Sequence, residues 1–285
     1  MIVSIASGKG GTGKTMVATN LAAVLGGDAQ YLDCDVEEPN GHIFLKPDFF
    51  KDYDVTVKIP SVDPGKCNYC GECQEVCAFN AILVLKEKKV IVFPELCHSC
   101  GACSLLCPTG AIEEEPRAIG KVECGVSGEV GFVHGKLNVG EPMAPPVIKE
   151  VMRNIDGDKV AIIDSAPGTS CPVVETVKDT DYCVLVTEPT PFGLNDLELA
   201  VEMLAKLKVP CGVVINRCDI GDDRVERFCS DHDIRVLMCI PHDMEIARVY
   251  SRGELIVHAM PEYRNSFNKL FLDIRAEIES WRVVG

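Results

Sequence analysis

The chain has 285 residues and a formal net charge of -15, from 28 Lys and Arg against 43 Asp and Glu with His counted as neutral. So acidic a chain argues against nucleic acid as a partner, because phosphate binding needs clustered Lys and Arg. No signal-peptide pattern and no apolar run of membrane-spanning length is present. We therefore expect a cytoplasmic protein that binds neither nucleic acid nor membrane, and whose 16 cysteines serve metal or redox chemistry instead of disulfides.

A glycine-rich octamer follows the first predicted strand, Ile2–Ala6, and precedes a helical pattern. It comprises Gly8, Lys9, Gly10, Gly11, Thr12, Gly13, Lys14 and Thr15. A phosphate-binding loop needs glycines so that backbone N–H groups converge on the phosphates, a lysine for the β/γ oxygens and a hydroxyl for Mg2+. The octamer meets all three needs, so we predict a nucleotide site at which Lys14 contacts phosphate and Thr15 binds Mg2+.

Lys9, the second residue of this loop, makes it resemble the deviant Walker A motif of the MinD/ParA/Mrp and nitrogenase iron protein group of P-loop ATPases. The resemblance implies an α/β fold with a doubly wound, mostly parallel sheet, and ATP or ADP with Mg2+ as ligands. It also implies that Lys9 reaches the nucleotide of a partner subunit. We therefore expect a nucleotide-dependent homodimer, or a dimer with a related ATPase.

Two predicted strands end in carboxylates, one at Asp33 and Asp35 and the other at Asp164. Alternation along a strand would place Asp33 and Asp35 on one side. Beside a nucleotide loop, such carboxylates can hold the Mg2+ water shell or orient the attacking water. The resemblance assigns Asp33 and Asp164 to Mg2+ and Asp35, at the switch I position, to the water. It also assigns the Gly168 amide, in switch II, to sensing the γ-phosphate.

The cysteines in the middle of the chain form two copies of one spacing. The copies are Cys67, Cys70, Cys73, Cys77 and Cys97, Cys100, Cys103, Cys107, offset by 30 residues. Gly71/Gly101, Ala81/Ala111 and Ile82/Ile112 keep the same offset, so the duplication extends past the cysteines. The pattern is similar to a bacterial-type two-cluster 4Fe-4S ferredoxin, although Ala78 stands where the first copy would usually have proline.

In such a module, three closely spaced thiolates surround one cluster and the remote fourth cysteine binds the other cluster. One predicted 4Fe-4S site therefore contains Cys67, Cys70, Cys73 and Cys107. The other contains Cys97, Cys100, Cys103 and Cys77. Zinc in two four-thiolate sites is the alternative.

The predicted organisation has three segments. Residues 1–56 begin the P-loop ATPase domain, 57–115 form the inserted α+β ferredoxin-type domain with 113–116 as a return linker, and 116–285 complete the ATPase domain. Residues 130–139 are predicted as a strand with Gly135 as a turn. Later strands at 182–186, 211–215 and 235–240 alternate with helices at 192–207, 222–230 and 244–251, as in a doubly wound sheet.

Two further features carry alternatives. Asn216 stands where the resembling family reads the base, and its amide offers the donor and acceptor that an adenine edge requires. A loop Asn that completes its own turn is the alternative. Cys171 follows Asp164 by seven residues, a spacing similar to that of the cysteine that holds the intersubunit cluster of nitrogenase iron protein, with Cys124 as a possible companion. An additional cluster there stays open.

The leading hypothesis from the sequence is a Mg2+-dependent ATPase that couples nucleotide state to electron transfer through two 4Fe-4S clusters and a redox partner. Eight ligands that enclose two clusters favour permanent clusters. The alternative is an ATP-dependent iron–sulfur cluster carrier or assembly scaffold, resembling the Mrp scaffolds, that delivers clusters to a receiving protein.

Overall fold

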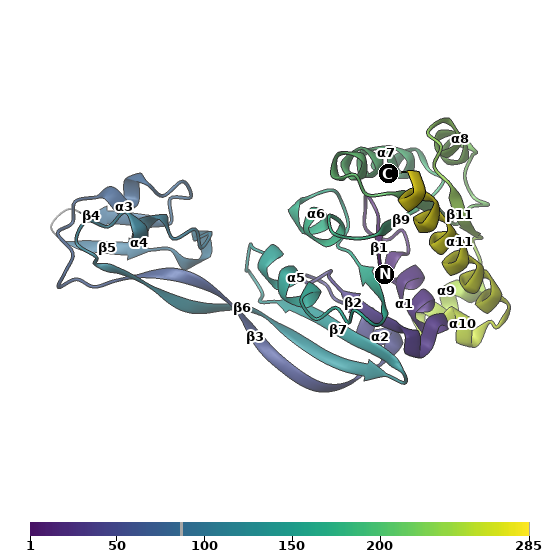
Figure 1. The fold of residues 1–285 in the computed structure, drawn as a ribbon, viewed down its shortest axis with the longest axis horizontal. Helices are drawn as coiled ribbons and strands as arrows, with labels where there is room; N and C mark the ends of the chain where they lie inside the picture. The colour runs from purple at the N-terminus through teal and green to yellow at the C-terminus, as the bar shows by residue number, and fades with distance from the viewer. Residues whose placement is uncertain (86–87, 285) are drawn as a thin grey trace.

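A nine-stranded sheet forms the body of the protein in the computed structural model, which describes residues 1–85 and 88–284 (Figure 1). Its strands are, in spatial order, β11 (Val236–Ile240), β10 (Cys211–Asn216), β9 (Tyr182–Thr187), β1 (Ile2–Ala6), β8 (Val160–Asp164), β2 (Ala29–Asp33), β7 (Val130–Leu137), β6 (Ile112–Ser127) and β3 (Asp48–Val62). The seven strands from β11 to β7 are parallel, whereas β6 and β3 are antiparallel additions. The predicted mostly parallel α/β sheet is therefore confirmed.

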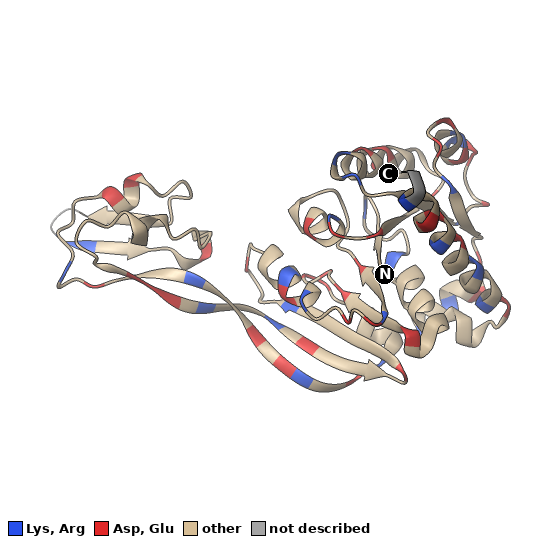
Figure 2. Ribbon diagram, in the orientation of Figure 1, with Lys and Arg blue, Asp and Glu red and all other residues tan. Residues whose placement is uncertain are grey.

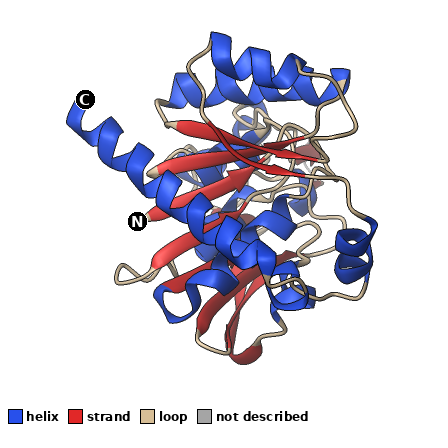
Figure 3. Cartoon of the chain, turned by 90° about the vertical axis from the view of Figure 1, so that its right-hand side faces the viewer, coloured by secondary structure: helices blue, strands red, loops and turns tan. Residues whose placement is uncertain are grey.

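Helices cover both faces of this sheet (Figure 3). They are α1 (Lys14–Leu25), α2 (Gly41–Leu45), α5 (Pro145–Met152), α6 (Cys171–Val177), α7 (Pro191–Leu207), α8 (Arg224–Asp231), α9 (Met244–Ser251), α10 (Ile256–Ala259) and α11 (Glu262–Val284). Strand residues alternate between the two faces, so that Ile162 packs with the α1 and α11 layer while Ile163 packs with α5. No helix in the described ranges is both long enough and apolar enough to cross a membrane.

A long two-stranded ribbon leaves one edge of the sheet. β3 and β6 pair from Asp48 opposite Val126 to Val62 opposite Ile112. Figure 1 shows that this ribbon extends beyond the helices and ends in a small unit, here called the cysteine module (residues 63–111). The module contains α3 (Glu72–Glu75), β4 (Ile82–Leu85), β5 (Lys89–Val92) and α4 (Ala102–Leu105). β4 and β5 lie between the two cysteine sets and pair antiparallel.

Two local expectations are wrong. Residues 113–116 are not a linker, because Glu113 pairs with Ser61 and Pro116 with Lys58 inside the ribbon. Gly135 is not a turn, since β7 runs straight through it. A Cβ at Gly135 would lie 2.8 Å from side-chain carbons of Val147 and Val151, so glycine is needed there for the close approach of α5.

The proposed segment boundaries at 56/57 and 115/116 fall inside β3 and β6. The chain therefore passes from the sheet into the cysteine module, and back, along two continuous paired strands. Charged residues alternate along this ribbon (Figure 2), and Lys121 pairs with Asp52 across it at 2.6 Å. The division into three segments stays a proposal.

Candidate functional site

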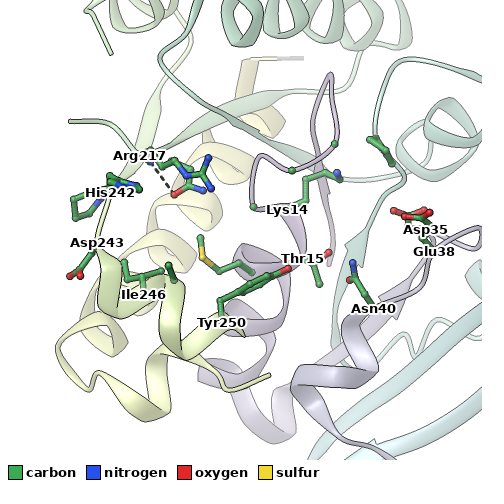
Figure 4. A pocket seen from close by; sticks show the side chains of 18 residues that line it. Lys14, Thr15, Asp35, Glu38, Asn40, Arg217, His242, Asp243, Ile246 and Tyr250 are labelled. Carbon is green, nitrogen blue, oxygen red and sulfur yellow. Dashed lines mark hydrogen bonds between the residues drawn. The ribbon is translucent and has the colours of Figure 1, made fainter. Parts of the chain in front are cut away.

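A cavity of about 370 Å³ lies at the carboxyl ends of the parallel strands, between the glycine-rich loop and α9 (Figure 4). From the loop it is lined by Gly10, Gly11, Gly13, Lys14 and Thr15. The segment after β2 contributes Asp35, Glu38 and Asn40, and the opposite wall contains Asn216, Arg217, His242, Ile246 and Tyr250. Ligands of open α/β sheets bind at this edge, so the structure gathers most of the predicted nucleotide residues around one cavity.

The loop has the shape that its glycines predict. Gly13 has a φ of 101°, and a Cβ there would lie 2.7 Å from the Asn216 amide nitrogen. α1 begins at the next residue, Lys14, whose side chain is mostly buried. Burial lowers the pKa of Lys14, while the nearby carboxylates of Asp164 and Asp35 raise it. The lysine is therefore held beside negative charge at the helix N-terminus, where a phosphate would bind.

Two buried carboxylates lie side by side at the ends of β2 and β8. Asp33 and Asp164 are opposite each other in the strand register. The Tyr31 hydroxyl donates to Asp164 Oδ2 at 3.0 Å, but Asp164 Oδ1 is buried and has no hydrogen-bond partner among the described residues. Burial raises the pKa of Asp164 to about 6, and burial together with Asp164 raises the pKa of Asp33 well above its ordinary value. The pair would be stabilised by a cation.

Mg2+ fits this donor set. It is usually held by one or two carboxylates, a hydroxyl and the substrate phosphates, and the unpartnered Asp164 oxygen lies near the Thr15 end of the loop. In the described residues, no three His, Cys, Asp or Glu side chains are close enough to hold one metal ion by themselves. Asp164, with Thr15 and Asp33, would therefore bind Mg2+ only together with a nucleotide.

Asp33 and Asp35 have different surroundings, contrary to the expected alternation. β2 ends at Asp33, which is fully buried and accepts hydrogen bonds from the backbone N–H groups of Asp35 (3.2 Å), Asn40 (3.1 Å) and Gly41 (2.9 Å). Asp35 lies beyond the strand and lines the cavity. Burial raises its pKa to about 6. A water-orienting role for Asp35 remains a prediction.

Lys9 and Gly168 make contacts inside the chain. Lys9 Nζ lies 3.2 Å from Glu188 Oε2, and the other oxygen of Glu188 accepts from Arg217 at 2.7 Å. The Gly168 amide, in a loop with a φ of 98°, donates to the Ser7 carbonyl at 2.9 Å. Lys9 is predicted to reach a nucleotide across a subunit interface, and the Gly168 amide is predicted to sense the γ-phosphate. Each role would require the residue to exchange its contact within the chain for a contact with nucleotide.

Asn216 supports the glycine-rich loop through side-chain hydrogen bonds. Its side-chain nitrogen donates to the Thr12 carbonyl at 2.8 Å, and its side-chain oxygen accepts from the Arg217 backbone N–H at 3.0 Å. The amide lines the cavity but is almost fully buried. This geometry favours a structural role, while recognition of a base remains a prediction.

Sequence reasoning missed the α9 wall. Tyr250 lines the cavity and reaches toward Thr15 (Figure 4), and its ring stacks on Phe44 of α2 with centroids 4.6 Å apart. No motif marks this tyrosine. Only the helical pattern of residues 244–251 identified its element, so its position in the site could not have been predicted.

The two cysteine sets lie in two separate cavities of the module. One cavity is lined by Cys67, Cys70, Cys73 and Cys107. The other is lined by Cys97, Cys100, Cys103 and Cys77. These are the two predicted groupings, including the exchange of the remote cysteine. Three loop thiols with one remote thiol fit a 4Fe-4S cubane, although ligation itself remains a prediction.

The backbone of the two copies repeats as well. Left-handed φ angles occur at Tyr69 and Ser99 (58° and 56°), at Gly71 and Gly101 (93° and 70°), and at Asn80 and Gly110 (54° and 61°). The remote thiols receive equivalent N–H bonds, from Ala81 to Cys77 at 3.2 Å and from Ala111 to Cys107 at 3.3 Å. Hydrogen bonds to sulfur are a feature of iron–sulfur sites, so both copies have the geometry of one kind of ligand loop.

Cys171 and Cys124 have different surroundings. Cys171 is exposed at the start of α6, whereas Cys124 is buried in β6 with its sulfur 3.7 Å from the Asn154 side-chain oxygen. An additional cluster at these residues has no further support from the structure.

Residues 3–256 match the CobQ/CobB/MinD/ParA nucleotide binding domain, so the chain belongs to this family of P-loop proteins. Solved structures agree at the level of the fold. MinD of Pyrococcus horikoshii, complexed with Mg-ADP, has a TM-score of 0.58 at 20% identity and covers 94% of this chain and 93% of its own.

Several relatives carry names that mention iron–sulfur clusters. The iron-sulfur cluster carrier protein of Pyrococcus furiosus is 25% identical over 280 residues, 90% of this chain and 78% of its own length. The chloroplastic Fe-S cluster assembly factor HCF101 of Oryza sativa is 25% identical over 238 residues, 80% of this chain and 34% of its own length. An uncharacterized protein of Methanocaldococcus jannaschii, MJ0579, is 32% identical over 291 residues, 100% of this chain and 98% of its own length. These names favour the carrier alternative over the electron-transfer hypothesis that led from the sequence.

Proposed function

We propose that this protein is an ATP-dependent iron–sulfur cluster carrier or assembly protein of the cytoplasm. The family match supports the nucleotide part, and the names of the Pyrococcus furiosus and Oryza sativa relatives support the cluster part. The observation that carries the proposal is the module, in which eight cysteines form two four-thiol cavities on the chain that also has the nucleotide cavity. Nucleotide binding alone would not need such a ligand set.

Each residue of the nucleotide cavity has a proposed task. Lys14 would contact the β/γ oxygens. Thr15 and Asp164, with Asp33 behind them, would hold Mg2+, which would supply positive charge at the phosphates. Asp35, which lines the cavity beyond β2, orients the attacking water. Lys14, Asp33 and Asp164 are buried, and a low local dielectric strengthens electrostatic interactions with phosphate.

Dimerisation would complete the site. Lys9 lies beside Glu188 in the single chain. The Lys9 ammonium can reach the nucleotide of a partner subunit only if it leaves Glu188. A homodimer, or a dimer with a related ATPase, would provide that nucleotide. The carried clusters would then pass to a receiving protein that docks on the cysteine module.

Electron transfer through two permanent 4Fe-4S clusters is the second candidate. It is favoured by the repeated geometry of the module, where each cavity has its own four cysteines and matching N–H···S bonds. Zinc in these sites is the other alternative, and it would require the thiols to move closer together, since no three described cysteines are close enough to hold one metal ion.

The test is the fate of the iron. Anaerobically loaded protein is mixed with an apo-ferredoxin, with and without ATP and Mg2+, and iron in the two proteins is measured after separation. ATP-stimulated transfer, abolished in a Lys14→Ala control, is the expected result for a carrier. Iron that stays on the module while it is reversibly reduced would instead support electron transfer, and bound zinc would reject both candidates.

A further inference from the structure

The short helix α2 lies between the nucleotide cavity and the root of the ribbon. We propose that α2 transmits the nucleotide state of the cavity to the ribbon, and so to the cysteine module, through a contact between His42 and the buried His134. The inference deepens the proposed function by naming how its two parts are linked, and it rests on nucleotide binding in the cavity.

The cavity side of α2 is fixed by two groups of contacts. Asn40, which precedes the helix, lines the cavity, and the N–H groups of Asn40 and Gly41 both donate to the same oxygen of Asp33. Phe44 stacks on Tyr250, another residue that lines the cavity. A nucleotide with Mg2+ that draws on the Asp33 carboxylate, or displaces Tyr250, would therefore act on α2 directly.

The other side of α2 contacts both strands of the ribbon through one imidazole. The rings of His42 and His134 meet edge to face, with centroids 5.5 Å apart. His134 lies on β7, and its Nε2 is 2.8 Å from Glu123 Oε2 on β6. Phe49 of β3 stacks on the same imidazole at 5.1 Å. His134 is thus the point where α2, β6 and β3 meet.

A second contact joins the end of α2 to the ribbon. The Ser127 hydroxyl, at the end of β6, donates to the carbonyl of Leu45, the last residue of the helix. His134 itself is fully buried, and its Nδ1 has no hydrogen-bond partner among the described residues. His42 Nδ1 is likewise buried without a hydrogen-bond partner among the described residues. This side of α2 is therefore a packed contact with two unsatisfied ring nitrogens, and a small shift of the helix can change their hydrogen bonding.

Such a contact can transmit a change because packed interiors respond to displacement by repacking instead of compressing. A ligand shifts a conformational equilibrium only by its difference in affinity for the two states. Here that difference would arise at Asp33, Asn40 and Tyr250. The distance that α2 has to bridge is short, because Asp33 and His134 are paired residues of the neighbouring strands β2 and β7.

The test uses hydrogen exchange of the full chain, prepared anaerobically, with and without Mg2+ and a non-hydrolysable ATP analogue. The variants are His42→Ala, which replaces a partly exposed residue of α2, and Ser127→Ala. The matched control is Ile43→Ala, because Ile43 is the exposed neighbour of His42 on the same helix. Nucleotide binding is titrated separately for each protein, and thermal unfolding confirms that each is folded.

We expect bound nucleotide to slow amide exchange in residues 112–127 of the parent by roughly fivefold, at the lower end of typical allosteric coupling. His42→Ala and Ser127→Ala should bind nucleotide with unchanged affinity but lose most of this protection, while Ile43→Ala retains it. Binding without protection in the parent, or full protection in both variants, would overturn the inference and leave the proposed function intact. A parent that does not bind nucleotide would overturn both.

Discussion

Replacement of Asn216 by alanine separates its two possible roles. The change removes the donor to the Thr12 carbonyl and the acceptor for the Arg217 N–H, at 2.8 and 3.0 Å. The bond to Thr12 is buried, whereas Arg217 is an exposed residue, so the free energy of unfolding should fall by roughly 1–3 kcal/mol, mainly from the abandoned Thr12 carbonyl. For a chain of this size the melting temperature should drop by about 2–5 °C. The glycine-rich loop would also lose the hydrogen bond that supports it at Thr12.

The assay compares thermal unfolding with binding of ATP and GTP in parent and Asn216→Ala proteins. If Asn216 braces the loop, the affinities for both nucleotides should fall by a similar factor, along with stability. If it reads the adenine edge, preference for ATP over GTP should shrink while stability hardly changes. Unchanged stability with lost base selectivity would refute the bracing argument drawn from these two hydrogen bonds.

Four further outcomes are expected. Lys14→Ala and Asp164→Asn should each lower ATP turnover about a hundredfold or more, and parent-like turnover in both would reject the nucleotide site. Glu188→Gln should release Lys9 and strengthen ATP-dependent dimerisation in analytical ultracentrifugation, whereas Lys9→Ala should abolish it. Anaerobic protein should contain about eight irons per chain and give reduced-state EPR of two interacting clusters. Burial lowers the pKa of His134, so folding disfavours its protonation and stability should fall below about pH 6.5. His134→Gln should flatten that decline, and an unchanged profile would contradict it.

The sequence predicted those parts of the site in which chemistry fixes residue type and spacing together. A phosphate loop must have its glycines, lysine and hydroxyl in one octamer, and the structure places Lys14 and Thr15 in the cavity wall. Thiolates that share a cluster must follow short loops, and both predicted sets line one cavity each. The bracing by Asn216 joins residues 204 positions apart, and no local pattern contains that information.

The ribbon could not be predicted, for a different physical reason. Its presence changes how the cysteine module is connected to the sheet. Most of β3 before Val55 is exposed, so its sequence lacks the alternation that marks a half-buried strand, and the acidic run 113–115 resembles a solvated linker. The pairing of β3 with β6 depends on residues 50 to 78 positions apart. A flexible linker would average out any movement of its root, whereas a twisted pair of hydrogen-bonded strands carries the orientation of that root to its far end. The module is therefore placed to respond to α2, and stiffness of the ribbon is a condition for nucleotide control of the cysteines.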